Sequence, residues 1–378
     1  MLNESNLVLP GTLPSNFERT PESKLRMPMI DSQEKATVRR FRKDVLDLFN
    51  RNKGGQMSRW TYLHDGGARW SKFIQSPQYY IPGEEAQLIA KNVDRLAERF
   101  KAANVLVDFG SGDEFAVRNK AMPLANALEN LQFYVPIDLA KDLLERATIV
   151  AKQLIPAHVD VNPVNGDFYR DYVNDSEQED GSIVIPGGNT LGIMLGSTIS
   201  NINMMEIDYE REFPRKTVVK NIQRMAELLK KNPGKHALAI SWDSNPDLDD
   251  ALKAYDDTNW HNMITGWLYH VDSVLQPTSP LKSRAFDPEK FHYEGVINPH
   301  NFTIQQCVVA DKRMEFKLNG QLITVNRGDR YVAVNNTKYP THFMRSLIEE
   351  AGFEPDEHDE KSYIVSEDGR LVMQTFDI

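Results

Sequence analysis

The residues whose types and spacing best suit a ligand site are Gly110, Ser111 and Gly112, followed further along the chain by Asp138. Glycine has no Cβ atom, so the backbone can turn tightly there and a ligand can approach it closely. An acidic residue after the second strand of such a unit accepts hydrogen bonds from ribose hydroxyls. The pattern predicts a nucleoside site between two strand ends.

The residues that follow the turn argue against a phosphate group on the ligand. Asp113 and Glu114 begin the helix expected there, and the third glycine of the dinucleotide fingerprint is absent. Two carboxylates at a helix N-terminus would repel a pyrophosphate, which binds to backbone amides at such positions. The sequence therefore favours a cationic ligand without phosphate, such as S-adenosylmethionine (SAM), over a dinucleotide.

Alternating strands and helices surround the turn and must position it. Apolar runs predict strands, and apolar residues at helical spacing predict amphipathic helices. The predicted strands are 105–107, 133–137, 158–161, 182–186 and 236–241. The predicted helices are 84–100, 139–154 and 218–231. This alternation predicts an α/β, Rossmann-like domain with a mostly parallel sheet and helices on both faces.

The pattern changes beyond residue 245. Three strand-like runs occur at 301–309, 313–318 and 321–325, with a helix expected over 341–351 and a final hairpin over 362–375. Asn319-Gly320 is a strong signal for a two-residue hairpin turn. These features predict a second, α+β domain, whereas residues 1–35 are expected to form an extended leader.

Composition limits the function classes. The formal net charge of -10 argues against a nucleic-acid surface, and no apolar run is long enough for a membrane span. The single cysteine, Cys307, excludes an internal disulfide and is expected in the core. His261 and His270 lack metal-ligand spacing, so no metal is expected. We expect a cytoplasmic protein, monomeric or weakly self-associating.

Several short motifs occur in an order that is more specific than any one of them. They are RWTY (59–62), SPQYYIP (76–82), VDFGSG (107–112), YVPIDLAKDLL (134–144), GDF (166–168), GSTISN (196–201) and AYDD (254–257). Together they resemble the SAM-dependent histidine Nα-methyltransferases of ergothioneine biosynthesis, a family with fungal relatives that methylate a prenylated tryptophan. The resemblance implies a SAM-binding domain over 83–244 and a substrate-binding domain built from 36–82 plus 245–378.

The resemblance also implies roles for individual residues. SAM would be held by Tyr79, Gly110, Ser111, Gly112, Asp138, Asp167 and Phe168. Tyr62, Asn201 and Tyr255 would hold the amine and carboxylate of a small-molecule, amino-acid-like substrate. Of these, Tyr62 and Asn201 are the expected catalytic residues, because the amine must lose its proton before it attacks the methyl group.

Two departures from the family pattern bear on the substrate. The histidine enzymes contact the imidazole through a glutamate and a serine, and here Val334 and Asn336 occupy those positions. Valine cannot pair with an imidazole N–H, so the acceptor is expected to be an amino acid or derived metabolite other than histidine. Histidine itself and a catalytically silent SAM-binding protein stay as alternatives. Asn189 is an alternative to Asn201, because GNTLG precedes GSTISN and follows the predicted strand 182–186.

Overall fold

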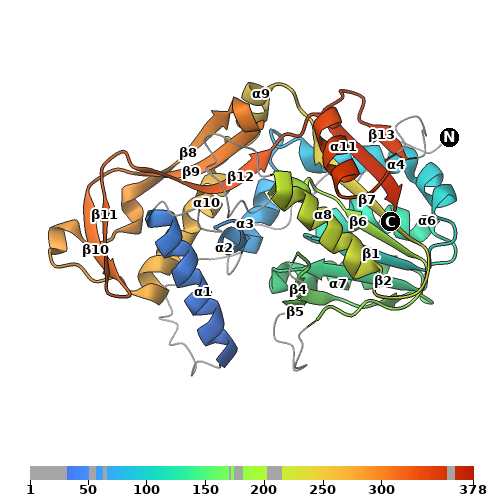
Figure 1. Ribbon diagram of the computed structural model, residues 1–378, viewed down its shortest axis with the longest axis horizontal. Helices are drawn as coiled ribbons and strands as arrows, with labels where there is room; N and C mark the ends of the chain where they lie inside the picture. The colour runs from blue at the N-terminus through green and yellow to red at the C-terminus, as the bar shows by residue number, and fades with distance from the viewer. Residues whose placement is uncertain are drawn as a thin grey trace, which may run out of the picture.

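The computed structural model describes residues 32–50, 57–62, 66–169, 172–173, 182–201, 215–355 and 362–378. The leader expected over residues 1–35 therefore lies almost wholly outside the described residues. Figure 1 shows two lobes, one built on a large sheet and the other on long antiparallel strands. The segments that join them meet near the carboxyl ends of the parallel strands.

The first lobe is built around a nine-stranded sheet with the order β13-β14-β7-β6-β1-β2-β4-β5, and β3 pairs with β2. Its strands are β1 (Val105–Phe109), β2 (Phe133–Asp138), β3 (Asp160–Val161), β4 (Val164–Asp167), β5 (Tyr172–Val173), β6 (Thr190–Met194), β7 (His236–Asp243), β13 (Tyr363–Val365) and β14 (Leu371–Asp377). The five neighbouring strands β4, β2, β1, β6 and β7 run parallel to one another. This order confirms the predicted Rossmann-like fold.

Helices cover both faces of this sheet (Figure 1). The helices of the chain are α1 (Ser32–Phe49), α2 (Ser58–Tyr62), α3 (Gly66–Phe73), α4 (Ile81–Arg99), α5 (Glu114–Ala116), α6 (Met122–Ala127), α7 (Lys141–Leu154), α8 (Arg215–Leu229), α9 (Leu248–Lys253), α10 (Thr258–His270) and α11 (Thr341–Glu350). Val105 and Val107 share one apolar cluster with α8 and α11, while Leu106 joins α4, α6 and α7 in another. The alternation along β1 thus gives the sheet two apolar faces.

The strand predicted over 182–186 is wrong, and the central position is taken by β6 instead. In residues 182–186 Val184 is exposed and Pro186 has no N–H to donate to a ladder. All five residues of β6 are buried, as expected for a central parallel strand covered on both faces. The loop at the carboxyl end of this strand therefore begins at residue 195.

The second lobe carries the antiparallel strands. These are β8 (Phe291–Asn298), β9 (Thr303–Ala310), β10 (Met314–Leu318), β11 (Gln321–Val325) and β12 (Arg330–Thr337), paired as β12-β9-β8 and β10-β11. The predicted hairpin turn is confirmed, because Asn319 and Gly320 join β10 to β11 with φ angles of 53° and 80°. Helix α10 packs on β8 and β9, so its apolar side chains form the core of this lobe.

The last part of the chain differs from the expected division into domains. Strand β14 pairs antiparallel with β7, β13 extends the same sheet, and α11 packs on α8. The described residues 341–355 and 362–378 thus lie with the Rossmann-like lobe, because β14 pairs with β7 and α11 packs on α8. We propose that the substrate-binding part is made of residues 36–82 and roughly 245–340.

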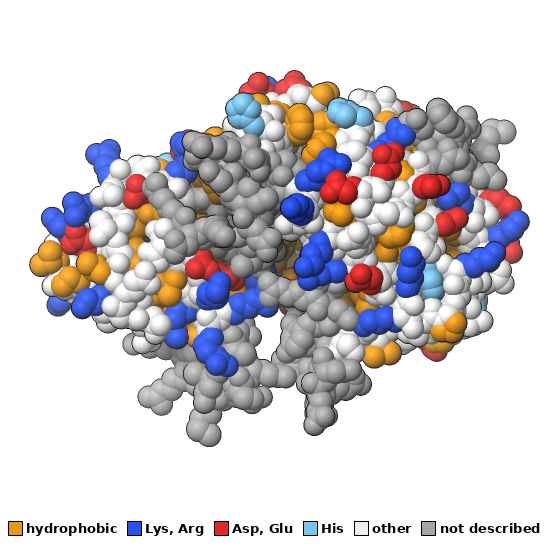
Figure 2. All heavy atoms as spheres, viewed as in Figure 1, with side chains coloured by type: hydrophobic (Ala, Val, Ile, Leu, Met, Phe, Trp, Pro, Cys, Tyr) orange, Lys and Arg blue, Asp and Glu red, His pale blue; other side chains and the backbone are white. Residues whose placement is uncertain are grey.

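The surface shows charges of both signs. On the described part of the face in Figure 2, acidic and basic side chains are interspersed and apolar groups are small and separate. Among the described residues, no helix has the length and apolarity that a bilayer crossing requires.

Candidate functional site

The Gly110–Gly112 turn lies at the carboxyl end of β1, where the strand order of the sheet reverses between β1 and β6. Gly110 and Gly112 have φ angles of 74° and 69°, in the left-handed region that favours glycine. A Cβ atom on Gly110 would lie 3.0 Å from Cγ2 of Thr198, in the loop after β6. The turn thus packs against that loop, at the position where open α/β sheets bind their ligands.

Asp138, at the carboxyl end of β2, holds the turn in place. Its Oδ2 accepts a hydrogen bond from the Gly112 N–H at 3.0 Å, and its Oδ1 accepts one from the Ala140 N–H at 2.8 Å. Burial raises the pKa of Asp138 to about 6, although the two backbone N–H groups favour the ionised form. Each carboxylate oxygen keeps a second lone pair, so Asp138 can position the turn and accept ligand hydroxyls at once.

Two adjoining cavities open at this edge of the sheet. We name them the outer and the inner cavity. The outer cavity is lined by residues that include Arg59, Tyr62, Asp138, Asp167, Phe168 and Asn201. The inner cavity is lined by residues that include Tyr79, Asp108, Ser111 and Lys120. Both cavities share Trp70, Gly110, Gly112, Gly196 and Thr198, so one extended ligand can occupy the two.

Asp167 and Phe168, which the family resemblance implies for SAM binding, line the outer cavity. The phenyl ring of Phe168 packs against Phe109 and Tyr169, with centroid distances of 5.3 and 4.5 Å. Asp167 forms an ion pair with Arg59, whose Nη2 lies 2.6 Å from Oδ2. Arg59, which no sequence signal assigned to the site, neutralises this buried carboxylate and adds a donor to the cavity wall.

The inner cavity contains two charged residues that the predicted cofactor set lacks. Asp108 is buried at the end of β1, and its Oδ2 accepts a hydrogen bond from the Tyr134 hydroxyl at 2.8 Å. Burial raises the pKa of Asp108 to about 7. Lys120 pairs with the buried Glu85 at 2.7 Å, and Glu85 also accepts the Gly196 N–H. The cavity therefore offers both a carboxylate and an ammonium group.

A one-turn π-helix over Val117–Ala121 explains how Lys120 reaches the cavity. The sequence places no basic residue in the five positions after Gly112. A π-turn adds a residue to the helix and changes the direction of the side chains that follow it. Lys120 can thus supply the missing positive charge from a later position, a result that the α-helical period alone does not predict.

Aromatic rings form the wall between the cavities and the second lobe. Tyr62 meets Trp70 edge to face at 5.6 Å, and Tyr79 lies 4.3 Å from Phe73 and 5.7 Å from Tyr255 between ring centroids. Burial raises the pKa of Tyr62 and of Tyr79, so both hydroxyls stay neutral at physiological pH. Such rings favour cationic groups at their faces.

Tyr255 lies behind this wall and is linked to a buried ion pair. Its hydroxyl accepts a hydrogen bond from Lys338 Nζ at 3.1 Å, and the same Nζ lies 2.5 Å from Asp243 Oδ2. Asp243 also accepts the Tyr80 hydroxyl at 2.6 Å. Burial opposes the charge on Lys338, but attraction by Asp243 and then Tyr80 keeps its pKa above the ordinary value.

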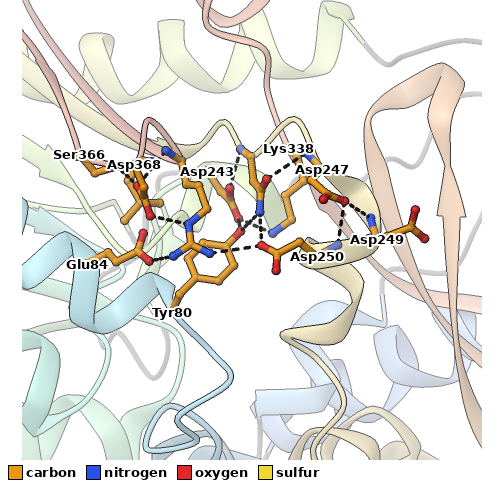
Figure 3. Close-up of polar contacts among 12 residues, drawn as sticks. Tyr80, Glu84, Asp243, Asp247, Asp249, Asp250, Lys338, Ser366 and Asp368 are labelled. Carbon is orange, nitrogen blue, oxygen red and sulfur yellow. Dashed lines mark hydrogen bonds and ion pairs between the residues drawn. The ribbon is translucent and has the colours of Figure 1, made fainter.

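Figure 3 shows that this network continues to the C-terminal hairpin. The guanidinium group of Arg370, in the turn before β14, lies 4.1 Å from the Tyr80 ring centroid. It pairs with Glu84 and with Asp250, the latter at 3.2 Å. The connected groups come from the start of α4, from β7 and α9, from the residue after β12, and from the turn between β13 and β14. They join the two lobes directly beside the candidate site.

Asn201 lies beside the outer cavity, in the short 3-10 helix Thr198–Asn201 that follows β6. Asn189 lies at the amino end of the same strand, where it bonds to the backbone of Ala102 and Lys235. Tyr255, Val334 and Asn336 are only 2%, 3% and 4% exposed and do not line either cavity. Asn336 instead donates to Oδ1 of Asn201 at 2.5 Å.

The chain matches one known protein family over most of its length. A profile described as "Histidine-specific methyltransferase, SAM-dependent" matches residues 41–365. The chain belongs to this family. The methyltransferase is 22% identical to the N-methyltransferase imqF of Aspergillus flavus over 75% of this chain and 71% of the relative. It is 20% identical to the N-methyltransferase fsqC of Aspergillus fumigatus over 76% and 71%.

Solved structures that resemble the methyltransferase are remote in sequence. One is the magnesium protoporphyrin IX methyltransferase of Synechocystis PCC 6803 with bound SAH, at 11% identity and a TM-score of 0.39, covering 84% of this chain and 96% of that chain. Another is a SAM-dependent methyltransferase from Clostridium acetobutylicum, at 10% identity and a TM-score of 0.38, covering 78% and 91%.

The cavities of this SAM-dependent N-methyltransferase fit its cofactor. Asp138 can accept the ribose hydroxyls, and Asp108 can face the cationic groups of SAM. The Ser111 hydroxyl is 2% exposed and has no hydrogen-bond partner among the described residues, so the inner cavity retains a free polar group for a ligand. Among the described residues, no group of three or more His, Cys, Asp or Glu is arranged to hold a metal.

Proposed function

We propose that this enzyme methylates the amine of an amino acid or amino-acid-derived metabolite, and that the acceptor is not histidine. The observation that carries the proposal is the position of Asn201, which lines the outer cavity together with Tyr62, Gly110 and Gly112. The proposed site for the methyl donor SAM therefore adjoins a polar side chain that can bind the amine or carboxylate of an amino acid. The two fungal relatives, both named N-methyltransferases, support an amine as the nucleophile.

The proposed chemistry depends mainly on positioning. SAM supplies an electrophilic methyl group, and the protein must hold a neutral amine in line with the bond that breaks. A free α-amine is largely protonated at neutral pH, so the site must favour its neutral form. Tyr62 and Trp70 place aromatic faces at the junction of the cavities, where they favour the cationic sulfonium and the methylated ammonium product.

The residues around Val334 support an acceptor other than histidine. Val334 is buried among apolar side chains, and its own side chain offers no hydrogen-bond acceptor for an imidazole. Asn336, on the same face of β12, has both ends of its amide bonded to other side chains. Neither residue lines a cavity, but an imidazole that extended from the outer cavity toward Val334 would leave a ring nitrogen unpaired, at a cost of about 1–3 kcal/mol. A larger or less polar side chain avoids this cost.

Methyl transfer from isotope-labelled SAM to a panel of amino acids tests the proposal. The panel contains histidine, tryptophan, tyrosine and prenylated tryptophan, with products identified by mass spectrometry. We expect label on the amine of a non-histidine member. Efficient labelling of histidine would contradict the argument from Val334, and SAM binding without any transfer would favour a catalytically silent SAM-binding protein.

The pKa of Asp108 predicts how SAM binding depends on pH. Its ionised form attracts the cationic groups of SAM, and its pKa of about 7 means that protons compete below neutral pH. Affinity should therefore fall by about tenfold between pH 8 and pH 6 through this group alone. Titration calorimetry at both pH values measures the change. Asp108→Asn should leave only the shallower contribution of Asp138, and an unchanged slope would contradict the role of Asp108.

A further inference from the structure

A chain of buried side-chain amides leads away from Asn201 into the second lobe. Asn336 Nδ2 donates to Asn201 Oδ1 at 2.5 Å, and Gln306 Nε2 donates to Asn336 Oδ1 at 2.7 Å. Gln306 Oε1 in turn accepts the Trp260 indole N–H at 2.9 Å and the Tyr293 hydroxyl at 2.6 Å. Gln306 and Trp260 are at most 1% exposed, so water cannot replace these partners.

We call the hydrogen-bonded series from Trp260 through Gln306 and Asn336 to Asn201 the amide relay. The indole of Trp260 fixes the orientation of every amide in it. An indole N–H is a donor and never an acceptor, so the oxygen of Gln306 must face Trp260. The amide nitrogen of Gln306 then faces Asn336, and the nitrogen of Asn336 faces Asn201. Reversing any one amide would place two donors or two acceptors together in a buried site, which is costly.

We infer that Trp260, Gln306 and Asn336 are positioning residues that present the amide N–H groups of Asn201 to the acceptor. The Oδ1 of Asn201 is bound on the protein side, so its Nδ2 is the end left for the cavity. An N–H donor complements the carboxylate of an amino acid, not its amine. This inference rests on the proposed function and assigns Asn201 to carboxylate recognition, whereas the sequence suggests an acceptor for the amine.

The same two strands provide a matched control on their opposite face. Gln305 Nε2 lies 3.5 Å from Asn335 Oδ1, so a second Gln–Asn pair joins β9 and β12 one residue away. Side chains alternate between the faces of a strand, so this pair points away from Trp260 and Asn201. A substitution at Gln305 therefore reproduces the local change without touching the relay.

Steady-state kinetics of Gln306→Met test the inference. The substrate is the amino acid that the wild-type enzyme methylates fastest in the panel described under Proposed function. It is used as its free acid and as its primary carboxamide, for example L-tryptophan and L-tryptophanamide. Methionine cannot donate to Asn336, so the relay loses its fixed direction. We expect the acid-to-carboxamide ratio of kcat/KM to fall by about tenfold or more, mainly through a higher KM for the acid. Gln305→Met should leave the ratio unchanged.

The outcomes separate this inference from the proposed function. No transfer by the wild-type enzyme would overturn the proposed function. Transfer by the wild type with an unaltered ratio in Gln306→Met would overturn only the relay. Equal falls in kcat for both acceptor forms would also overturn it, because a general loss of structure does not discriminate between acid and carboxamide.

Gln306→Glu provides a second test if the methionine variant does not fold. A protonated carboxyl group can still donate to Asn336, whereas an ionised one can only accept. Burial raises the pKa of such a carboxyl group, so the variant should resemble the wild type at low pH and lose its preference for the acid as pH rises. Burial raises the pKa of Tyr293, whose hydroxyl contacts Gln306, so this group stays neutral. His261 stacks on Tyr293 at 4.1 Å, and its contribution to the pH dependence is measured in the wild-type enzyme. A preference independent of pH would count against the relay.

Discussion

Replacing Lys338 with methionine is expected to lower the free energy of unfolding by about 3–5 kcal/mol. The change leaves the Asp243 carboxylate buried without its partner, since Asp243 is 0% exposed and Lys338 2%. It also removes the donor to the Tyr255 hydroxyl, so activity should fall even in the folded fraction. Urea unfolding, followed by circular dichroism, measures the loss of stability.

Arg330→Met is the matched control for this prediction. Arg330 begins β12, the strand that ends one residue before Lys338, and pairs with Glu294 at 2.5 Å, but both side chains are well exposed. An exposed pair contributes less than about 1 kcal/mol. Similar losses in the two variants would show that burial of the Lys338–Asp243 pair has no special energetic weight.

Replacing Asp138 with alanine is expected to weaken SAM binding by about a hundredfold or more. The change removes the acceptor that we propose for the ribose hydroxyls, and it also releases the Gly112 and Ala140 N–H groups that shape the site. Two lost hydrogen bonds to a charged group are together worth about 3 kcal/mol or more, which corresponds to this factor. Titration calorimetry with SAM gives the dissociation constant.

Asp142→Ala controls for the loss of a negative charge near the same site. Asp142 lies in the first turn of α7, four residues after Asp138, and its side chain is partly exposed. We expect its effect on SAM affinity to be at most a few-fold. Unchanged affinity in Asp138→Ala would contradict its assignment to the cofactor, whereas equal losses in both variants would point to long-range electrostatics.

The strands and turns with the strongest local signals could be predicted from the sequence. The apolar run before Gly110 forms β1, the two glycines adopt the left-handed conformation expected of them, and Asn319-Gly320 closes the hairpin. These features depend on short stretches of chain. Local backbone preferences and side-chain alternation decide them, so no knowledge of distant segments is needed.

Predictions that depended on choosing between similar segments were less successful. Residues 182–186 and 190–194 both have the apolar character of a strand, and only β6 fits between β1 and β7 with every side chain buried. The same choice separates Asn201 from Asn189, which lie at opposite ends of that strand. The C-terminal hairpin was expected to lie with the substrate-binding segments, but β14 pairs with β7, more than 100 positions away in the chain, and local patterns do not reveal such a pairing.

The sequence by itself determined the Rossmann-like scaffold, the glycine turn and the acidic residue that holds it, and the ordered motifs of the methyltransferase family. The tertiary structure alone decided the contacts around the acceptor site: Lys120 reaching the inner cavity through a π-turn, Lys338 paired with Asp243, and Asn201 held by an amide relay from Trp260. The reason is physical. Local periodicity sets which elements form, whereas the partner of a buried polar group depends on which distant elements pack against it.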